Sequence, residues 1–101
     1  MMSVNFITVS EMQQKLALAV RTKRLHLNLS QQTLSEKSGV SCSVLKKFER
    51  TGKISLESLL MLAIVLGSMD DFKGLFAPEK PEIAASLDEL MKDTTRKRGR
   101  K

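Results

Sequence analysis

The sequence predicts an all-α protein, and three observations support this fold class. The chain of 101 residues contains only five Gly and two Pro, fewer turn-forming residues than an all-β domain needs. Its apolar residues recur at spacings of three and four, which is the period of a helix with one buried face. Its four aromatic residues are all Phe, so the core is expected to be aliphatic. A chain of this length suits one small domain, and we expect five helices in it.

The first expected helix follows a short N-terminal arm, residues 1–10. Within the arm, residues 4–9 (VNFITV) favour β structure, so this segment is an arm or a strand that pairs with another chain. Ser10 and Gln13 match the S-x-x-Q capping box, which predicts a helix over residues 11–25. The buried stripe of that helix is expected to contain Met12, Leu16, Ala19 and Val20.

Two short helices joined by a tight turn come next. Ser30 is a suitable N-cap for a helix over residues 31–38, and Gly39 lies where a left-handed residue ends a helix. Ser41 is a suitable N-cap for the following helix, residues 42–50. We expect its buried side chains to be Val44, Leu45 and Phe48.

The C-terminal half begins with a strongly apolar helix. Ser55 caps residues 56–66, which are apolar over most of the helix circumference and are therefore expected to pack at the centre of the bundle. Residues 69–76 predict a fifth, short helix. The two Pro residues make 77–82 a linker, and a capping box at Ser86 allows one more short helix, LDELMK.

Charge is distributed unevenly along the chain. The net charge is +6, but Glu11 carries −1, residues 13–54 carry +7 and residues 55–95 carry −5. Residues 96–101 (RKRGRK) add +5, and because 94–101 contain no apolar side chain we expect a flexible basic tail. A basic first half and a basic tail indicate a polyanionic partner on one face. The acidic side chains at positions 70, 71, 79, 82, 88 and 89 are expected to be a solvated face, with a docking surface for a basic partner as the alternative.

Residues 31–53 carry most of the functional information. Two short helices joined by a turn at Gly39 must cross steeply, which presents the N-terminal end of the second helix outward. This helix-turn-helix arrangement places the second helix in the major groove of B-DNA. The side chains expected to contact bases or phosphates are Gln31, Gln32, Ser41, Cys42, Ser43, Lys46, Lys47, Arg50 and Lys53.

The basic tail has two open interpretations. Its side chains either add sequence-independent contacts to DNA phosphates or dock on a partner protein. The residues concerned are Arg96, Lys97, Arg98 and Arg100.

The composition offers no set of catalytic residues. With one His, which has no Asp, Cys or second His near it in sequence, no Ser-His-Asp set can be argued. The single Cys forbids an internal disulfide and any Cys-based metal cage. We therefore expect no enzymatic activity, no metal and no cofactor. Cys42 is expected to be a small residue facing DNA or solvent, with a redox switch as the alternative.

No apolar run reaches the roughly 18 residues of a membrane span, and no secretory signal is visible, so we expect a cytoplasmic, nucleoid-associated protein without a membrane partner.

The pattern resembles the lambda-repressor-like (XRE) helix-turn-helix family over residues 11–67. Ser35 replaces the usual Ala of that family, and Thr51 adds one residue before the Gly, which is expected to lengthen the following loop. The resemblance implies a five-helix DNA-binding domain over 11–77, followed by a linker, a short helix and the tail in 78–101. It also implies that Arg24 and Glu49 form a structural ion pair. The matching residues are Gln31, Leu34, Ser35, Gly39, Val40, Ser41, Leu45, Phe48, Glu49 and Gly52.

A narrower resemblance to HipB-type antitoxins extends further along the chain. It rests on FERTGKISLESLLMLAIVLG, DDFKGLF, an S-L-D-E-L element and the Arg/Lys-rich end. It implies a sequence-specific repressor that binds double-stranded operator DNA as a homodimer and acts as the antitoxin of a HipA-like Ser/Thr kinase toxin. The alternative is a stand-alone regulator of the phage-repressor or restriction-controller type. Dimerisation is expected through residues 4–9 and the apolar residues near 72–76.

Overall fold

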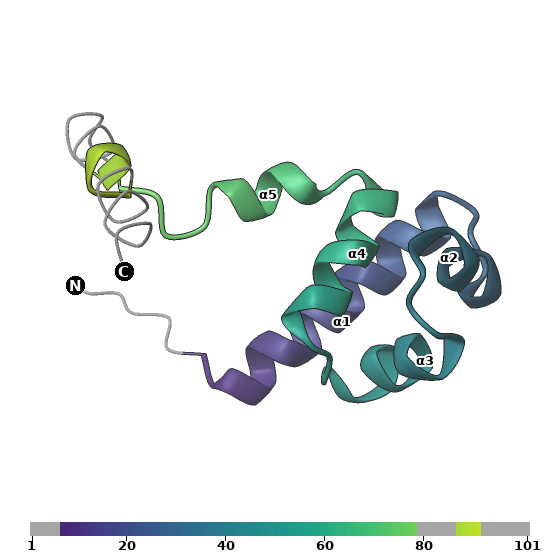
Figure 1. Ribbon diagram of the computed structural model, residues 1–101. Coiled ribbons are helices and arrows are strands. Elements are labelled where there is room, and N and C mark those ends of the chain that lie inside the picture. The colour runs from purple at the N-terminus through teal and green to yellow at the C-terminus, as the bar shows by residue number, and fades with distance from the viewer. Residues whose placement is uncertain (1–6, 79–86, 92–101) are drawn as a thin grey trace, which may run out of the picture. The chain divides into compact units, whose positions relative to one another are not determined.

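The computed structural model describes residues 7–78 and 87–91, which are helical apart from turns (Figure 1). Because no strand occurs within these ranges, the all-α fold class is confirmed. Residues 87–91 form a short helix in addition to the five labelled ones, so the described residues contain six helices. No helix among them is long and apolar enough to cross a membrane. The predicted arm or strand covers residues 4–9, of which 4–6 lie outside the described residues. Residues 7 and 8 do not lie in a strand, and Val9 already belongs to a helix. The tail at 94–101 also lies outside the described residues. The labelled helices are α1 (Val9–His26), α2 (Gln31–Ser38), α3 (Cys42–Thr51), α4 (Leu56–Leu66) and α5 (Met69–Lys73).

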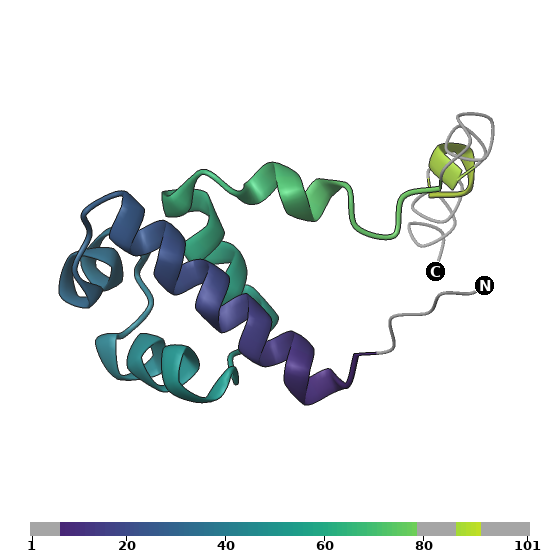
Figure 2. The same cartoon turned by 180° about the vertical axis from the view of Figure 1, so that it is seen from behind.

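The chain divides into two compact units, Met1–Asp70 and Asp71–Lys101. In the first unit α1 packs on α3 and α4, and α2 also packs on α3 and α4. Figures 1 and 2 show the long α1 running across this unit, with α2 and α3 together on one side. The second unit contains the end of α5 and the helix at residues 87–91.

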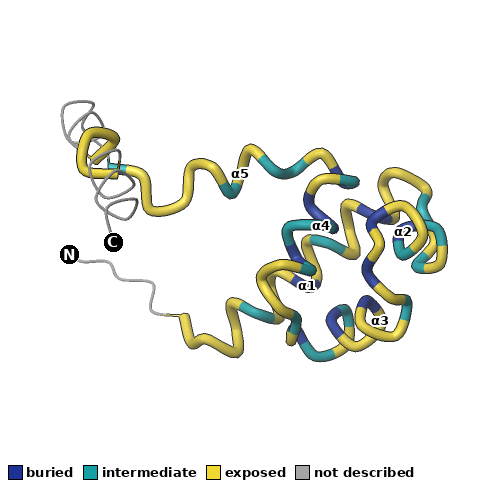
Figure 3. The backbone as a smooth tube through the Cα atoms, viewed as in Figure 1, coloured by how far each residue is buried: buried dark blue, intermediate teal, exposed yellow. Residues whose placement is uncertain are grey.

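The core of the first unit is aliphatic except for one ring, that of Phe48. Figure 3 shows the buried positions along the backbone of α1 to α4. α4 contributes four buried residues, as expected for a helix that is apolar over most of its surface. Leu34, Leu45, Leu62 and Phe48 are the largest side chains that are fully buried. The remaining buried apolar residues are Ala17, Val40, Leu59, Ala63 and Leu66.

α1 begins at Val9, two residues before the predicted start, so the proposed cap at Ser10 is wrong. Thr8 is the N-cap: its hydroxyl accepts a hydrogen bond from the Glu11 backbone N–H at 3.0 Å. The Thr8 backbone N–H in turn donates to Glu11 Oε1 at 2.9 Å, which completes a capping box. A carboxylate in the first turn also interacts favourably with the helix dipole, an advantage that Gln13 lacks. The hydrogen bonds of Glu11 with the Thr8 backbone and hydroxyl hold the pKa of the Glu11 carboxyl below its ordinary value.

The buried face of α1 also differs from the predicted stripe. Met12, Leu16 and Ala19 are exposed, whereas Ala17 and Arg24 are buried. α1 carries apolar side chains on more than one face, so spacing did not identify the face that packs against α3 and α4. The side chains along the buried line are Gln13, Ala17, Val20 and Arg24, of which Gln13 and Val20 are half-buried.

Two further predictions about helices need correction. Val44 is 39% exposed, so only Leu45 and Phe48 anchor α3 to the core. α5 ends at Lys73 instead of residue 76, directly before Gly74, and the following Phe76 is fully exposed. The helix at 69–76 is thus shorter than its apolar pattern predicted, because Gly is a poor helix former.

Gly52 fixes the end of α3 against α1. Its φ of 84° lies in the left-handed region that favours glycine. A Cβ built on Gly52 would lie 2.8 Å from the backbone carbonyl carbon of Gln13, which leaves no space for a side chain. Since this contact is made with backbone, α3 can approach α1 so closely only with glycine at this position.

Candidate nucleic-acid interface

The connection between α2 and α3 is stabilised by side-chain hydrogen bonds. Gly39 adopts φ 82° after the last residue of α2 and turns the chain toward α3. The Ser35 hydroxyl donates to the Val40 carbonyl oxygen at 2.6 Å, and the Val40 N–H donates to Ser38 Oγ at 3.1 Å. Val40 itself is buried. Ser35, which stands where the family usually has Ala, therefore satisfies a backbone carbonyl of the turn in addition to being small.

α3 has one buried side and one polar side. Leu45 and Phe48 face the core, and Ser43, Lys46, Lys47 and Arg50 are exposed on the opposite side. These four residues project from one surface because a helix turns 100° per residue. The predicted contact residues of α3 are therefore brought together on an exposed, basic surface.

The N-terminal end of α3 is held by its cap. The Ser41 hydroxyl accepts a hydrogen bond from the Val44 N–H at 3.2 Å and lies 3.4 Å from the Ser43 hydroxyl. Cys42, the first residue of α3, carries a free and half-buried thiol. The small side chains of these three residues leave the first turn of α3 sterically open.

A buried ion pair joins α1, α2 and α3 beside this surface. Arg24 Nε donates to Glu49 Oε2 at 2.8 Å and Arg24 Nη2 donates to Glu49 Oε1 at 2.9 Å. Arg24 Nη1 also donates to the Leu29 carbonyl oxygen at 2.9 Å. Gln31 Nε2 completes the cluster with a hydrogen bond to Glu49 Oε1 at 3.1 Å. Gln31, predicted to approach a phosphate, thus already has one of its amide hydrogens engaged by Glu49.

The extra residue Thr51 extends α3 and does not lengthen the following loop, contrary to the expectation. Its hydroxyl donates to the Lys47 carbonyl oxygen at 2.8 Å and accepts from the Lys53 N–H at 3.1 Å. The Thr51 carbonyl oxygen accepts a hydrogen bond from Gln14 Nε2 on α1 at 2.9 Å. The carbonyl oxygens of Lys47 and Thr51, near the end of α3, thus each accept a hydrogen bond from a side chain.

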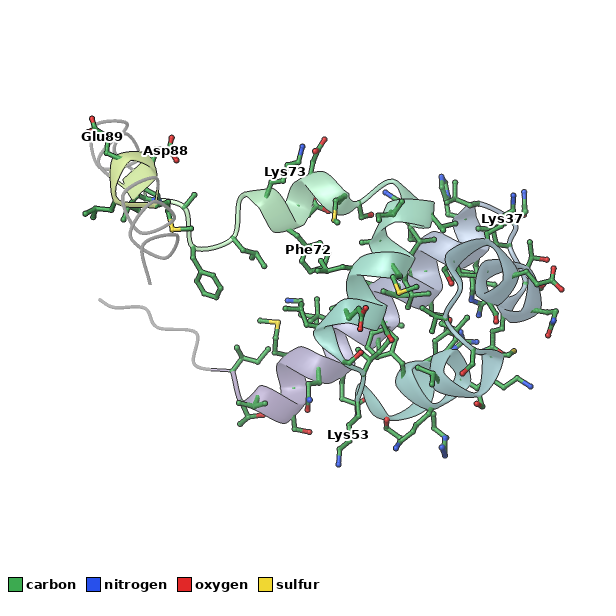
Figure 4. All side chains as sticks on the ribbon, viewed as in Figure 1. Lys37, Lys53, Phe72, Lys73, Asp88 and Glu89 are labelled. Carbon is green, nitrogen blue, oxygen red and sulfur yellow. The ribbon has the colours of Figure 1, made fainter. Side chains whose placement is uncertain are left out.

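The other predicted contact residues lie at different places. Lys53 projects into solvent from the turn after α3 (Figure 4). Lys37, which was not a predicted contact, projects from α2 at another edge of the unit (Figure 4). Gln32 is exposed on the first turn of α2 and donates to Glu36 Oε2 at 3.1 Å. The predicted tail contacts lie outside the described residues: Arg96, Lys97, Arg98 and Arg100.

Sequence analysis missed one cation beside this surface, Arg21 of α1. Arg21 lines a shallow polar depression together with Arg24, Gln31, Lys46, Glu49 and Arg50. Its position one helical turn before Arg24 is a signal that could have placed it, because residues three apart lie on the same helix face.

The comparison with protein families decides the identity of this arrangement. The family model HTH_3, described as Helix-turn-helix, matches residues 20–72, more than half of the chain. The chain belongs to the lambda-repressor-like (XRE) helix-turn-helix family. Neither a curated protein nor a solved structure matches it. As a member of this family, the protein is a DNA-binding transcription regulator. Within the described residues, no group of three His, Cys, Asp or Glu side chains could hold a metal ion.

Proposed function

We propose that this XRE protein is a sequence-specific repressor that reads operator DNA with α3. The observation that carries the proposal is the division of α3 into a buried side, Leu45 and Phe48, and an exposed polar side. Insertion of that exposed side into a major groove would bring Ser43 and Lys47 to base edges, where hydroxyl and ammonium groups can hydrogen-bond.

The proposed reader residues are tested by comparing two DNA duplexes. One covers the promoter region of the protein's own gene, and the other has the same length and a mixed sequence. The double variant Ser43→Ala, Lys47→Ala is expected to lose the preference for the promoter duplex while its melting temperature stays unchanged. Lys37→Ala, which removes an exposed cation from α2, serves as the control and should keep the preference. Equal loss on both duplexes would show that these side chains only contact phosphates.

The repressor is proposed to act as a homodimer. One helix-turn-helix module makes few base contacts, whereas a two-fold dimer reads an inverted repeat with half-sites about 34 Å apart. Leu75 and Phe76 support a dimer because they are 55% and 99% exposed, more apolar surface than a short solvated segment usually carries. Sedimentation equilibrium of the whole chain tests this proposal, with a single species of one chain mass at micromolar concentration as the contradicting result.

The repressor is further proposed to be an antitoxin that binds a HipA-like Ser/Thr kinase. The proposal rests on the resemblance of residues 48–76 and of the elements that follow to HipB-type antitoxins. Purification of the tagged protein from its native host is expected to recover a kinase in stoichiometric amount. Recovery of the protein with promoter DNA but without a kinase would favour the stand-alone regulator instead. In either role, the protein is proposed to have no enzymatic activity and no cofactor.

A further inference from the structure

The polar depression between α1, α2 and α3 carries charge that the fold does not use. Six side chains line it: Arg21, Arg24, Gln31, Lys46, Glu49 and Arg50. They comprise four cations and one carboxylate, a formal charge of +3 at neutral pH. Because Glu49 is paired with Arg24, the cations left over are Arg21, Lys46 and Arg50. All three are exposed.

The bottom of the depression is held in place by the buried cluster. Arg24 and Glu49 are 7% and 6% exposed and are joined by two hydrogen bonds, and Gln31 is tied to the same carboxylate. Gln31 is also the first residue of α2, where the helix dipole and the free backbone N–H groups favour an anion. An anion entering the depression would thus meet three exposed cations above a bottom that is held by hydrogen bonds.

We propose that this depression binds one backbone phosphate of the DNA duplex, with Arg21 as a ligand that reaches it from α1. The ligand is a phosphodiester because Lys46 and Arg50 belong to the depression and to the exposed side of α3 at once. The phosphates of a DNA strand whose bases face α3 would therefore lie along the edge of this depression. Guanidinium groups suit this role because they donate several N–H groups to phosphate oxygens. The proposal rests on the DNA-binding role proposed above and adds a phosphate contact from outside the helix-turn-helix.

The consequence is measurable as a salt dependence. Each phosphate neutralised by a protein cation adds about −0.9 to the slope of log K against log[salt] for B-DNA. From this slope, loss of one phosphate contact weakens DNA binding at 0.1 M salt by about eightfold, on any DNA sequence. Base-reading side chains, in contrast, change the preference between sequences.

The test is fluorescence anisotropy with a mixed-sequence duplex over about 50–200 mM NaCl, a range in which phosphate contacts change the affinity strongly. Arg21→Gln and, separately, Lys46→Gln are expected to lower the magnitude of the slope by about one each. Lys23→Gln is the matched control, because Lys23 is also an exposed cation of α1 but lines a different surface, with Lys15 and Leu18. Its slope should equal that of the unaltered protein. Melting temperatures of all variants should be unchanged, since the replaced side chains are exposed.

Three outcomes separate this proposal from the function on which it depends. Unchanged slopes for both Arg21→Gln and Lys46→Gln, with normal DNA binding by the unaltered protein, would overturn the phosphate site and leave the DNA-binding role intact. Failure of the unaltered protein to bind any duplex would overturn both. Inorganic pyrophosphate that raises the melting temperature of the unaltered protein but not of Arg21→Gln, together with unchanged DNA slopes, would show a site for a small phosphorylated molecule and so overturn the assignment to DNA.

Discussion

Removal of the Glu49 carboxylate is expected to be among the most destabilising single changes in this protein. In Glu49→Ala, Arg24 keeps its bond to the Leu29 carbonyl oxygen but loses both hydrogen bonds to the carboxylate. The Arg24 side chain is 7% exposed, so water cannot fully replace these hydrogen bonds. A buried charge left without its partner costs about 3–5 kcal/mol. For a domain of 60–100 residues that corresponds to a fall in Tm of more than about 12 °C.

The assay is urea unfolding followed by circular dichroism, with two comparison variants. Glu36→Gln alters an exposed carboxylate of α2 and should change the free energy of unfolding by less than about 0.5 kcal/mol. The double variant Arg24→Met, Glu49→Leu removes both charges and should recover most of the loss, because apolar replacement of a whole buried pair is often neutral or stabilising. A loss below about 1 kcal/mol in Glu49→Ala, the range of exposed ion pairs, would refute this reasoning.

Two further predictions concern local structure. Gly52→Ala should lower the free energy of unfolding more than Gly67→Ala in the same urea assay. Both glycines have positive φ, but only at Gly52 would the new Cβ lie 2.8 Å from the backbone of Gln13. Equal decreases in the free energy of unfolding would show that this contact relaxes freely. Because the pKa of Glu11 is lowered in the folded protein, its capping box with Thr8 contributes stability that is complete above the unfolded-state pKa and lost as the pH falls through the folded pKa. Glu11→Gln should therefore flatten the acid limb of the stability–pH curve, and an unchanged acid limb would contradict this role.

The parts of the fold that the sequence predicted well are those set by neighbouring residues. Ser30 and Ser41 cap α2 and α3 as expected, and Gly39 is left-handed between them. Each of these features depends on hydrogen bonds or backbone sterics within four residues, so a short stretch of sequence contains the necessary information. The start of α1 was harder, since Thr8 and Ser10 both begin a capping-box pattern and only the true cap has a Glu as its partner.

The parts that could not be predicted depend on how helices cross. The periodicity of α1 favoured Met12 and Leu16 as buried residues, yet the helix turns Ala17 and Arg24 inward. Arg side chains are mostly exposed in proteins, and Arg24 can be buried because the Glu49 carboxylate of α3 pairs with it. The position of Arg21 beside Lys46 has the same origin: the spacing from Arg24 indicates only a shared face of α1, and the packing of α1 on α3 brings that face beside Lys46.

The central claim is that the exposed side of α3 contacts DNA bases, and amide chemical shifts measured during titration with the promoter duplex test it most directly. The account predicts that the largest shift changes fall on residues 41–50 and at the start of α2. Large changes over residues 56–66, with α3 unaffected at saturating DNA, would contradict it.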